Sequence, residues 1–250
     1  MQNTLSDFPK LHCPFIRQTF KVNYDDWKMH GSEFQLREPE AYLVVNRVNP
    51  GYEWVFDDPE TIAVEKLDGT NVKILTENGR LLAVQNRLNV IDPLQVIKGK
   101  NFIIEGLFQA IGKDYVKIDG EQVGELIGPK LQGNPYKLDI HLWYPFHKAI
   151  SDLRYKSFHE HDRTFDNWSS WFRTHLVSRF FTKRASKLSL DEVVMAEGVI
   201  FYNLKRRADG KVWMAKLRRN MFDWYYTDGI RIEGYIQEGR DVVEDQEKLD

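Results

Sequence analysis

A lysine, an aspartate and a glycine stand close together in the stretch EKLDGTNVKI, residues 65–74. Apolar residues lead into the stretch and alternate after it. We therefore expect Lys66 to end one strand and Asp68-Gly69 to turn the chain into the next. A lysine at the end of a rigid strand is partly shielded from water, which favours the neutral amine that can attack an electrophile. Asp68, two residues further along an extended chain, would share that face and could hold a metal-bound water. The alternative is an exposed lysine before an ordinary tight turn, and a motif this short does not decide between them.

Two more carboxylates and two more cations stand in patterns that suit a charged site. Glu125 in VGELIG and Glu197 in AEGVIF each lie beside a glycine among apolar residues. This pattern favours carboxylates held inside a cleft, and the alternative is a solvated strand residue. Lys216 and Arg218 alternate in WMAKLRR, so on a strand they share one face. Two cations on one face can bind phosphates, and the alternative is the basic solvent face of an amphipathic strand.

The elements that position these residues are predicted from periodicity and turn signals. They make an α+β fold in which antiparallel sheets predominate and helices flank them. In chain order we expect a strand at 40–48, a strand at 61–67, a hairpin at 71–87 about Asn78-Gly79, a helix at 101–112, a strand pair at 115–128 about Asp119-Gly120, an aromatic strand at 140–146, helical structure at 158–182, a hairpin at 195–219 about Asp209-Gly210, and an acidic tail after Thr227 whose end, EDQEKLD at 244–250, is frayed.

Composition limits the classes of protein that remain. The chain has 250 residues, 42% of them hydrophobic, and a net charge of -2. It can bury a sizeable core, and any surface for nucleic acid must be a local patch. Cys13 is the single cysteine, so no internal disulfide can form and a reducing, cytoplasmic location is expected. No signal peptide and no apolar run of about 20 residues is present, which predicts no membrane partner.

The stretch KLDGTN resembles motif I of the covalent nucleotidyltransferases, the superfamily of DNA ligases, RNA ligases and mRNA capping enzymes. Further resemblances follow in the family's order over residues 62–220: Arg87 in VQNRLNVID, Glu125 in VGELIGPKLQGNPY, Trp143 and Phe146 in HLWYPFH, Glu197 in AEGVIF, and Lys216 with Arg218 in AKLRR. The phrase GELIGPKLQGNPY most resembles RNA ligases. The chain departs from the family at His147, where an aspartate is usual, and at Arg218, where a lysine is usual.

The resemblance implies a role for each charged residue. Lys66 would attack the α-phosphorus of ATP, release pyrophosphate and carry AMP as a lysyl-AMP. Asp68, Glu125 and Glu197 would converge on Mg²⁺ or Mn²⁺, mainly through water, because Mg²⁺ keeps several of its waters. Lys216 and Arg218 would clamp the triphosphate and neutralise the leaving group.

The resemblance also implies residues that would hold the nucleoside. Arg87 would contact the ribose or a phosphate, with a surface ion pair as the alternative. Trp143 or Phe146 would stack on adenine. On a regular strand two residues three apart face opposite ways, so we expect one of them to stack and prefer Trp143, with a core position as the alternative. Glu65 would offer its backbone to the base.

Residues 148–187 form a basic and aromatic insertion between two of these motifs. Basic side chains can follow a phosphate backbone, and aromatic rings can stack on unpaired bases. Arg179, Lys183 and Arg184 are the predicted RNA-binding residues. The alternative is an amphipathic helix whose aromatic side chains lie in the core.

Together these patterns predict an ATP-dependent RNA ligase that joins RNA 5'-phosphate and 3'-hydroxyl ends through a lysyl-AMP and an adenylylated RNA. We expect an N-terminal segment at 1–60, an adenylation core of nucleotidyltransferase, ATP-grasp-like type at 61–227, and an acidic tail at 228–250. The short stretch after motif V predicts no C-terminal OB domain, which argues against DNA ligases and capping enzymes. RNA would then be held by the core, by the N-terminal segment or with help from an RNA-binding or end-processing partner. The alternatives are a DNA ligase, a capping-type guanylyltransferase, or a silent nucleotide- or RNA-binding module.

Overall fold

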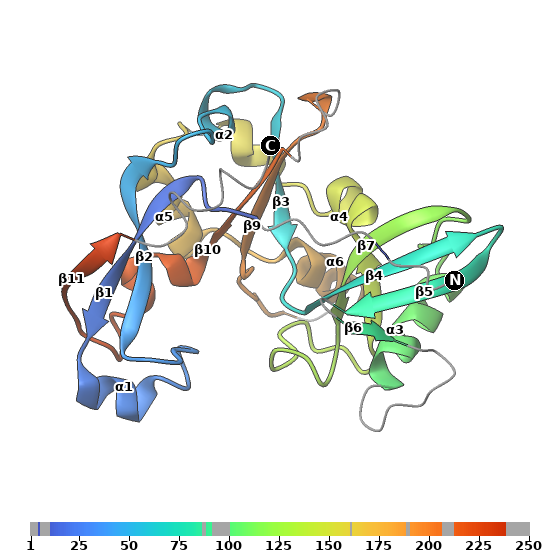
Figure 1. Cartoon of the computed structure of the whole chain (residues 1–250), viewed down its shortest axis with the longest axis horizontal. Helices are drawn as coiled ribbons and strands as arrows, with labels where there is room; N and C mark the ends of the chain where they lie inside the picture. The colour runs from blue at the N-terminus through green and yellow to red at the C-terminus, as the bar shows by residue number, and fades with distance from the viewer. Residues whose placement is uncertain are drawn as a thin grey trace. The chain divides into compact units, whose positions relative to one another are not determined.

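The chain forms helices and antiparallel sheets that divide between two compact units (Figure 1). This computed structural model describes residue 5 and residues 11–86, 89–91, 101–160, 162–188, 191–206 and 213–238. Unit 1 comprises Met1–Lys10, Leu67–Arg154 and Val177–Ala196. Unit 2 comprises Leu11–Lys66, Tyr155–Leu176 and Glu197–Asp250. Within the described residues, no helix is both long enough and apolar enough to span a membrane.

Unit 1 is built on a five-stranded antiparallel sheet in the order β6-β5-β4-β7-β8. The strands are β4 (Thr70–Glu77), β5 (Arg80–Asn86), β6 (Asn89–Ile91), β7 (Gly120–Ile127) and β8 (Leu142–Pro145). Helices α3 (Asn101–Gly112), α4 (Phe146–Asp152) and α6 (Arg179–Leu188) complete it. Asn78 and Gly79, both with positive φ, turn β4 into β5, as their residue types predict.

Unit 2 contains two three-stranded antiparallel sheets. The first has the order β11-β1-β2 and consists of β1 (Phe15–Val22), β2 (Glu40–Val48) and β11 (Ile232–Glu238). The second has the order β10-β9-β3 and consists of β3 (Thr61–Lys66), β9 (Gly198–Asn203) and β10 (Met214–Arg218). The helical elements of this unit are α1 (Tyr24–His30), α2 (Trp54–Asp57), α5 (Phe165–Thr174) and the short 3-10 helices η1 (Lys156–Glu160), η3 (Arg219–Met221) and η4 (Asp223–Tyr225).

Helix α5 supplies the aromatic centre of unit 2. Thr164 caps it by accepting a hydrogen bond from the Asn167 amide. Its Trp168 is buried, stacks on Phe201 of β9 at 5.0 Å between ring centroids and meets Phe15 of β1 edge-on at 5.6 Å. One indole therefore packs against both sheets and fixes β9, the strand that follows Glu197.

Two predicted elements were wrong in part. Residues 115–119 form no strand: the Ile118 carbonyl accepts from the Gly79 amide, and β7 pairs with β4 and β8 instead, so both edges of β7 are already taken. The helical stretch predicted at 158–182 is broken, because α5 ends at Thr174 and α6 begins at Arg179. The acidic stretch after Thr227 also contains a strand that was not predicted, β11, which pairs with β1. The turn predicted at Asp209-Gly210 and the frayed end predicted at 244–250 lie outside the described residues.

Candidate active site

Lys66, Glu197 and Arg218 come together at one end of the β10-β9-β3 sheet. In the strand register, Lys66 on β3 and Arg218 on β10 both lie opposite Gly198, the first residue of the central strand. Glu197 immediately precedes that glycine. Neighbouring strands lie about 4.8 Å apart, so this register sets a cation on each side of one carboxylate.

The side chains make the contacts that the register permits. Lys66 Nζ lies 2.5 Å from Glu197 Oε2, and Arg218 Nη1 lies 3.8 Å from Glu197 Oε1. Lys66 and Glu197 are 131 residues apart in the sequence. The side chains of Lys66 and Glu197 are 23% and 19% exposed, so the pair is open to solvent on one side. The Lys66 amine is mostly buried beside a carboxylate, yet it is still exposed enough to be reached by a substrate.

Gly198 is needed where the central strand passes β10. A Cβ atom on this residue would lie 2.2 Å from the Leu217 carbonyl oxygen and 2.8 Å from Arg218 Cα. Both are backbone atoms, so neither can rotate away. The glycine that follows Glu197 is thus explained by the close approach of the strand that carries Arg218.

A second lysine and the N-terminal segment extend the positive charge. The pKa of Lys216 is lowered to about 8, first because the residue is buried and then because Arg218, Arg17 and Lys66 are near. The Lys216 amide donates to the His12 carbonyl, which ties β10 to the segment leading into β1. Burial also lowers the pKa of Arg17. The site therefore gathers like charges, which an anionic ligand would stabilise.

Arg17 and Cys13 were missed by the sequence analysis. Burial raises the pKa of the Cys13 thiol to about 11, against the opposing effect of Arg17, Lys216 and Arg218. A lone arginine in the strand FIRQTFKV belongs to no motif. The only signal was its place among apolar residues. Glu65, whose backbone was predicted to meet the base, is buried on β3 opposite Val199.

In unit 1, Asp68 and Glu125 belong to neighbouring segments. A Cβ atom on Gly69 would lie 2.2 Å from the Leu126 carbonyl oxygen and 3.0 Å from Glu125 Cγ, so the turn after Lys66 presses against β7. Asn71 on β4 pairs with Glu125 on β7. Two of the three predicted metal-binding carboxylates therefore come from segments in contact.

The remaining predicted nucleotide-binding residues differ in exposure. Trp143 is fully buried, and its Nε1 donates to the Val72 carbonyl at 3.0 Å. This is the core position weighed as the alternative to stacking. Phe146, at the start of α4, is only partly buried. His147 has a lowered pKa because of burial and the nearby Lys117 and Lys148. Arg87 lies outside the described residues.

The comparisons with known proteins are of structure rather than sequence. No protein-family model matches the chain, and no curated protein matches it. Among solved structures, it is similar to a Naegleria gruberi RNA ligase with PPi, with 17% identity, a TM-score of 0.37, and coverage of 67% of this chain and 51% of that one. A mutant of the Naegleria gruberi RNA ligase with ATP and Mn gives 13% identity, a TM-score of 0.35, and coverage of 91% and 68%. The chain thus spans about half the length of the solved chain with PPi.

The predicted RNA-binding residues on α6 already make contacts within unit 1. Lys183 Nζ donates to the Asp152 carbonyl at 2.5 Å, and Arg184 Nη1 donates to the Tyr136 carbonyl at 3.0 Å. Arg179 is partly buried. The basic stretch itself is divided, because residues 155–176 belong to unit 2 and residues 177–187 to unit 1. Its buried aromatic residues include Phe158, Trp168, Phe172 and Phe181, which is the core role expected for such residues.

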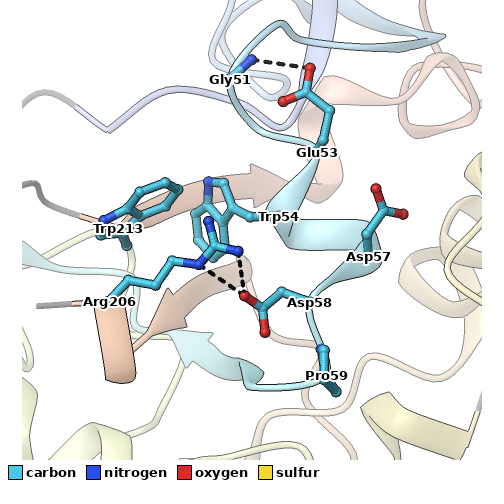
Figure 2. Close-up of a pocket in the computed structure, with 8 residues that line it drawn as sticks. All are labelled: Gly51, Glu53, Trp54, Asp57, Asp58, Pro59, Arg206 and Trp213. Atoms are coloured by element: carbon cyan, nitrogen blue, oxygen red, sulfur yellow. Dashed lines mark hydrogen bonds and ion pairs between the residues drawn. The ribbon is translucent and has the colours of Figure 1, made fainter.

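A cavity of about 560 Å³ lies in unit 2 near the opposite end of β9 from Glu197 (Figure 2). Trp54 and Trp213 meet edge-on in its wall at 5.7 Å, and the Arg206 guanidinium lies 4.6 Å from the Trp213 ring centroid. Arg206 also pairs with Asp58 at 2.7 Å. The described lining includes none of the predicted site residues.

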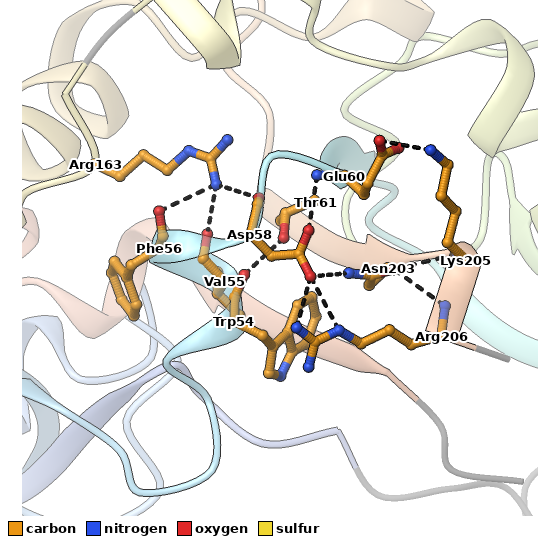
Figure 3. A network of polar contacts seen from close by, with 10 residues as sticks. All are labelled: Trp54, Val55, Phe56, Asp58, Glu60, Thr61, Arg163, Asn203, Lys205 and Arg206. Atoms are coloured by element: carbon orange, nitrogen blue, oxygen red, sulfur yellow. Dashed lines mark hydrogen bonds and ion pairs between the residues drawn. The ribbon is translucent and has the colours of Figure 1, made fainter. Parts of the chain in front are cut away.

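The polar groups beside this cavity join neighbouring elements (Figure 3). Asp58 accepts hydrogen bonds from Asn203 at the end of β9 and from Arg206, and its pKa is lowered first by the Glu60 amide. Arg163 donates to the carbonyls of Val55, Phe56 and Asp58. The Asp58 contacts tie the end of α2 to β9, and the Arg163 contacts tie α2 to the segment before α5, so the network is explained by folding.

Proposed function

We propose that this protein is an ATP-dependent RNA ligase that forms a lysyl-AMP on Lys66. The observation that supports this best is the union of Lys66, Glu197 and Arg218 at one end of one sheet. The three residues come from three separate sequence motifs. A salt bridge between Lys66 and Glu197 that only stabilised the fold would not require two cations, Lys216 and Arg218, on one face of β10.

In the first step, Lys66 Nζ attacks the α-phosphorus of ATP. A nitrogen–phosphorus bond forms, the bond from the α-phosphorus to the bridging oxygen breaks, and pyrophosphate leaves. The ammonium form has no lone pair, so Lys66 must lose a proton before it attacks. Glu197 Oε2, 2.5 Å from Nζ, is the atom that would receive this proton.

The two cations of β10 would act on the leaving group. Lys216 and Arg218 share one strand face, and positive charge fixed where negative charge accumulates lowers the barrier to phosphoryl transfer. Arg218 offers a planar fork, which suits two phosphate oxygens at once. Its Nε is buried and has no hydrogen-bond partner among the described residues. A phosphate oxygen would satisfy this donor.

Asp68 and Glu125 fit a magnesium or manganese ion bound largely through water. Hard oxygen ligands suit these ions, and Mg²⁺ needs only one or two carboxylates of the protein. When bound, the ion would supply positive charge to the nucleotide phosphates. No cluster of three His, Cys, Asp or Glu residues suited to a metal occurs among the described residues. The family resemblance also assigns Glu197 to the ion, through water.

For the base we favour Phe146 over Trp143, because the Trp143 ring has no exposed face in this structure. Arg87 would contact the ribose or a phosphate, and Glu65 would offer its backbone. In the later steps AMP would pass from Lys66 to an RNA 5'-phosphate. A 3'-hydroxyl would then attack that phosphate and AMP would leave. RNA with these two ends is the proposed substrate.

Covalent labelling tests the first step directly. Purified protein should take up label from α-labelled ATP with a divalent metal, and no label from γ-labelled ATP. The bond should be released by acid and survive alkali, as a phosphoramidate does. Lys66→Ala should lower labelling by at least about a thousandfold, because no other residue replaces an activated nucleophile. Lys21→Ala, which removes an exposed lysine of unit 2, should label as the wild type does.

The alternatives give different outcomes in the same experiment. Preferred labelling with α-labelled GTP would indicate a capping-type guanylyltransferase, and sealing of DNA ends in preference to RNA ends would indicate a DNA ligase. ATP binding without a covalent product would indicate a silent binding module. Labelling that survives in Lys66→Ala would refute Lys66 as the nucleophile.

A further inference from the structure

The turn that follows Lys66 is held by the loop at residues 128–137. The Asp68 amide donates to the Tyr136 hydroxyl at 2.8 Å, and Gln132 Nε2 donates to the Gly69 carbonyl at 3.4 Å. Asp68 and Gly69 lie between β3, which ends at Lys66, and β4, which begins at Thr70. A backbone amide in such a turn has no strand partner, yet it must be satisfied when it is shielded from water. The Tyr136 hydroxyl meets this need.

The Tyr136 side chain is itself fixed. It is only 1% exposed, and its ring meets Phe180 of α6 at 5.1 Å and 68°. Arg184, also on α6, donates to the Tyr136 carbonyl and pairs with Asp139 at 3.5 Å. A hydroxyl on a ring that is packed on one side and anchored through its backbone stays in one place.

The backbone around Tyr136 is held by hydrogen bonds within its own loop. Asn134 and Lys137 have φ values of 52° and 50°, in the left-handed region that few residues adopt without support. Asn134 supplies that support, since its side chain donates to the Leu138 carbonyl and accepts from the Leu138 amide. The loop that holds the turn is therefore itself held by its own hydrogen bonds.

We propose that Tyr136 is a positioning residue that fixes the Asp68-Gly69 turn, which lies against β7 at Glu125, and with the turn the position of the Asp68 carboxylate. This rests on the proposed function, in which the Asp68 and Glu125 carboxylates hold the divalent metal. The Tyr136 hydroxyl acts by orienting the peptide that carries Asp68, as outer partners of metal ligands commonly do.

The matched pair of variants is Tyr136→Phe and Tyr144→Phe. Tyr144 is also buried, meets the same Phe180 ring at 5.4 Å and 87°, and donates its hydroxyl to Asp152 at 2.9 Å. Each variant removes one hydroxyl and keeps the ring that packs on Phe180. Only Tyr136→Phe removes the partner of the Asp68 amide, so a general loss of packing or stability would affect both variants.

The first readout is the rate of label uptake from α-labelled ATP, measured over a range of Mn²⁺ concentrations with the full chain. Tyr136→Phe should raise the Mn²⁺ concentration needed for half the maximal rate by about tenfold, the lower end of effects seen when outer partners of metal ligands are removed. Saturating Mn²⁺ should restore most of the rate. Tyr144→Phe should keep the wild-type requirement. An unchanged requirement in Tyr136→Phe, or an equal change in both variants, overturns the proposal.

The second readout does not depend on activity. Hydrogen exchange of the backbone amides at residues 67–72 should be faster in Tyr136→Phe than in the wild type and Tyr144→Phe, since the Asp68 amide has lost its partner. Equal exchange in the two variants also overturns the proposal. If the wild type takes up no label, the proposed function fails. The exchange comparison then still decides whether the Tyr136 hydroxyl holds the turn.

Discussion

Lys216 is the residue of the candidate site whose charge should change within an accessible pH range. Its pKa lies at about 8 because the residue is buried and because Arg218, Arg17 and Lys66 repel its ammonium form. The native state therefore binds fewer protons here than the unfolded state between about pH 8 and 10.5, the ordinary value. Stability contributed by this group rises with pH across that window and is lowest below pH 8. Below pH 8 the Lys216 ammonium thus lowers the stability of the folded protein, as expected for a cation placed where an anion binds.

This shift predicts that nucleotide affinity falls as the pH rises. Below pH 8 the Lys216 ammonium can pair with a phosphate, and above it the amine is neutral. The Kd for ATP without metal should rise by up to about tenfold between pH 7 and pH 9, if only the charged form binds well. Lys216→Arg should flatten the profile, because a guanidinium stays charged over this range. Calorimetric titration with ATP at several pH values measures both profiles.

The control for this prediction is Lys205→Arg, which changes an exposed lysine of unit 2 paired with Glu60. It should keep the wild-type pH profile. A wild-type Kd that stays constant from pH 7 to pH 9 would contradict the role of Lys216, as would an unchanged slope in Lys216→Arg.

At the scale of single residues, the sequence predicted those that belong to motifs and missed those that do not. Lys66 and Glu197 belong to two separate motifs, and the structure brings their side chains into contact, while their proposed roles stay predictions. Arg17 and Tyr136 were not predicted, because their importance comes from the segments they touch in the folded chain. Trp143 shows the opposite limit, since its place in a motif did not reveal that its ring is enclosed.

At the scale of elements, the approach of β9 to β10 is the feature most sensitive to substitution. Gly198→Ala would set a Cβ atom 2.2 Å from the Leu217 carbonyl oxygen, so β10 would have to move. We expect a loss of about 1–3 kcal/mol in the free energy of unfolding, the usual cost of overpacking. Labelling of Lys66 should also fall, because β10 carries Lys216 and Arg218. Denaturant unfolding and the labelling assay measure the two effects.

Gly234→Ala is the matched control, because this glycine also lies on a strand of unit 2 and a Cβ atom there would meet nothing within 4 Å. It should change the unfolding free energy by less than about 0.5 kcal/mol, as most surface substitutions do. Equal losses in the two variants would show that strand glycines in general matter, and the specific approach of β9 to β10 would not explain Gly198.

Elements with a strong local signal were predicted well. The alternation in EAYLVVNRV indicated β2, and Asn78-Gly79 indicated the β4–β5 turn. The strand predicted at 115–119 failed because a second turn dipeptide, Asp119-Gly120, looks the same locally, while the partner of β7 is β4, far away in sequence. The β11 strand was missed because its pairing with β1 spans most of the chain.

At the scale of the molecule, the division into two units lay beyond the sequence analysis, since each unit is assembled from separated segments. The chain passes from unit 2 to unit 1 between Lys66 and Leu67, and back between Ala196 and Glu197. The two residues of the ion pair are therefore the unit 2 residues at these two crossings. The alternating pattern of a strand does not reveal such a crossing, because the residues before and after the crossing have the same pattern.

If this chain binds RNA, its net charge of -2 means that it must do so through a local patch. Arg184 holds Tyr136, so the test leaves it intact and changes Arg179 and Lys183 to Gln. If α6 binds RNA, this double variant should bind single-stranded RNA more weakly, and its plot of log K against log salt should be less steep by about 0.7 for each lost phosphate contact.

The control is Lys113→Gln with Lys117→Gln, which removes two exposed charges from the same unit and should keep the wild-type slope. Label uptake by Lys66 should be unchanged in both, because neither pair belongs to the adenylylation motifs. Identical salt slopes for the two double variants would mean that α6 is only a solvated surface, and RNA would then have to be bound elsewhere on the chain or by a partner.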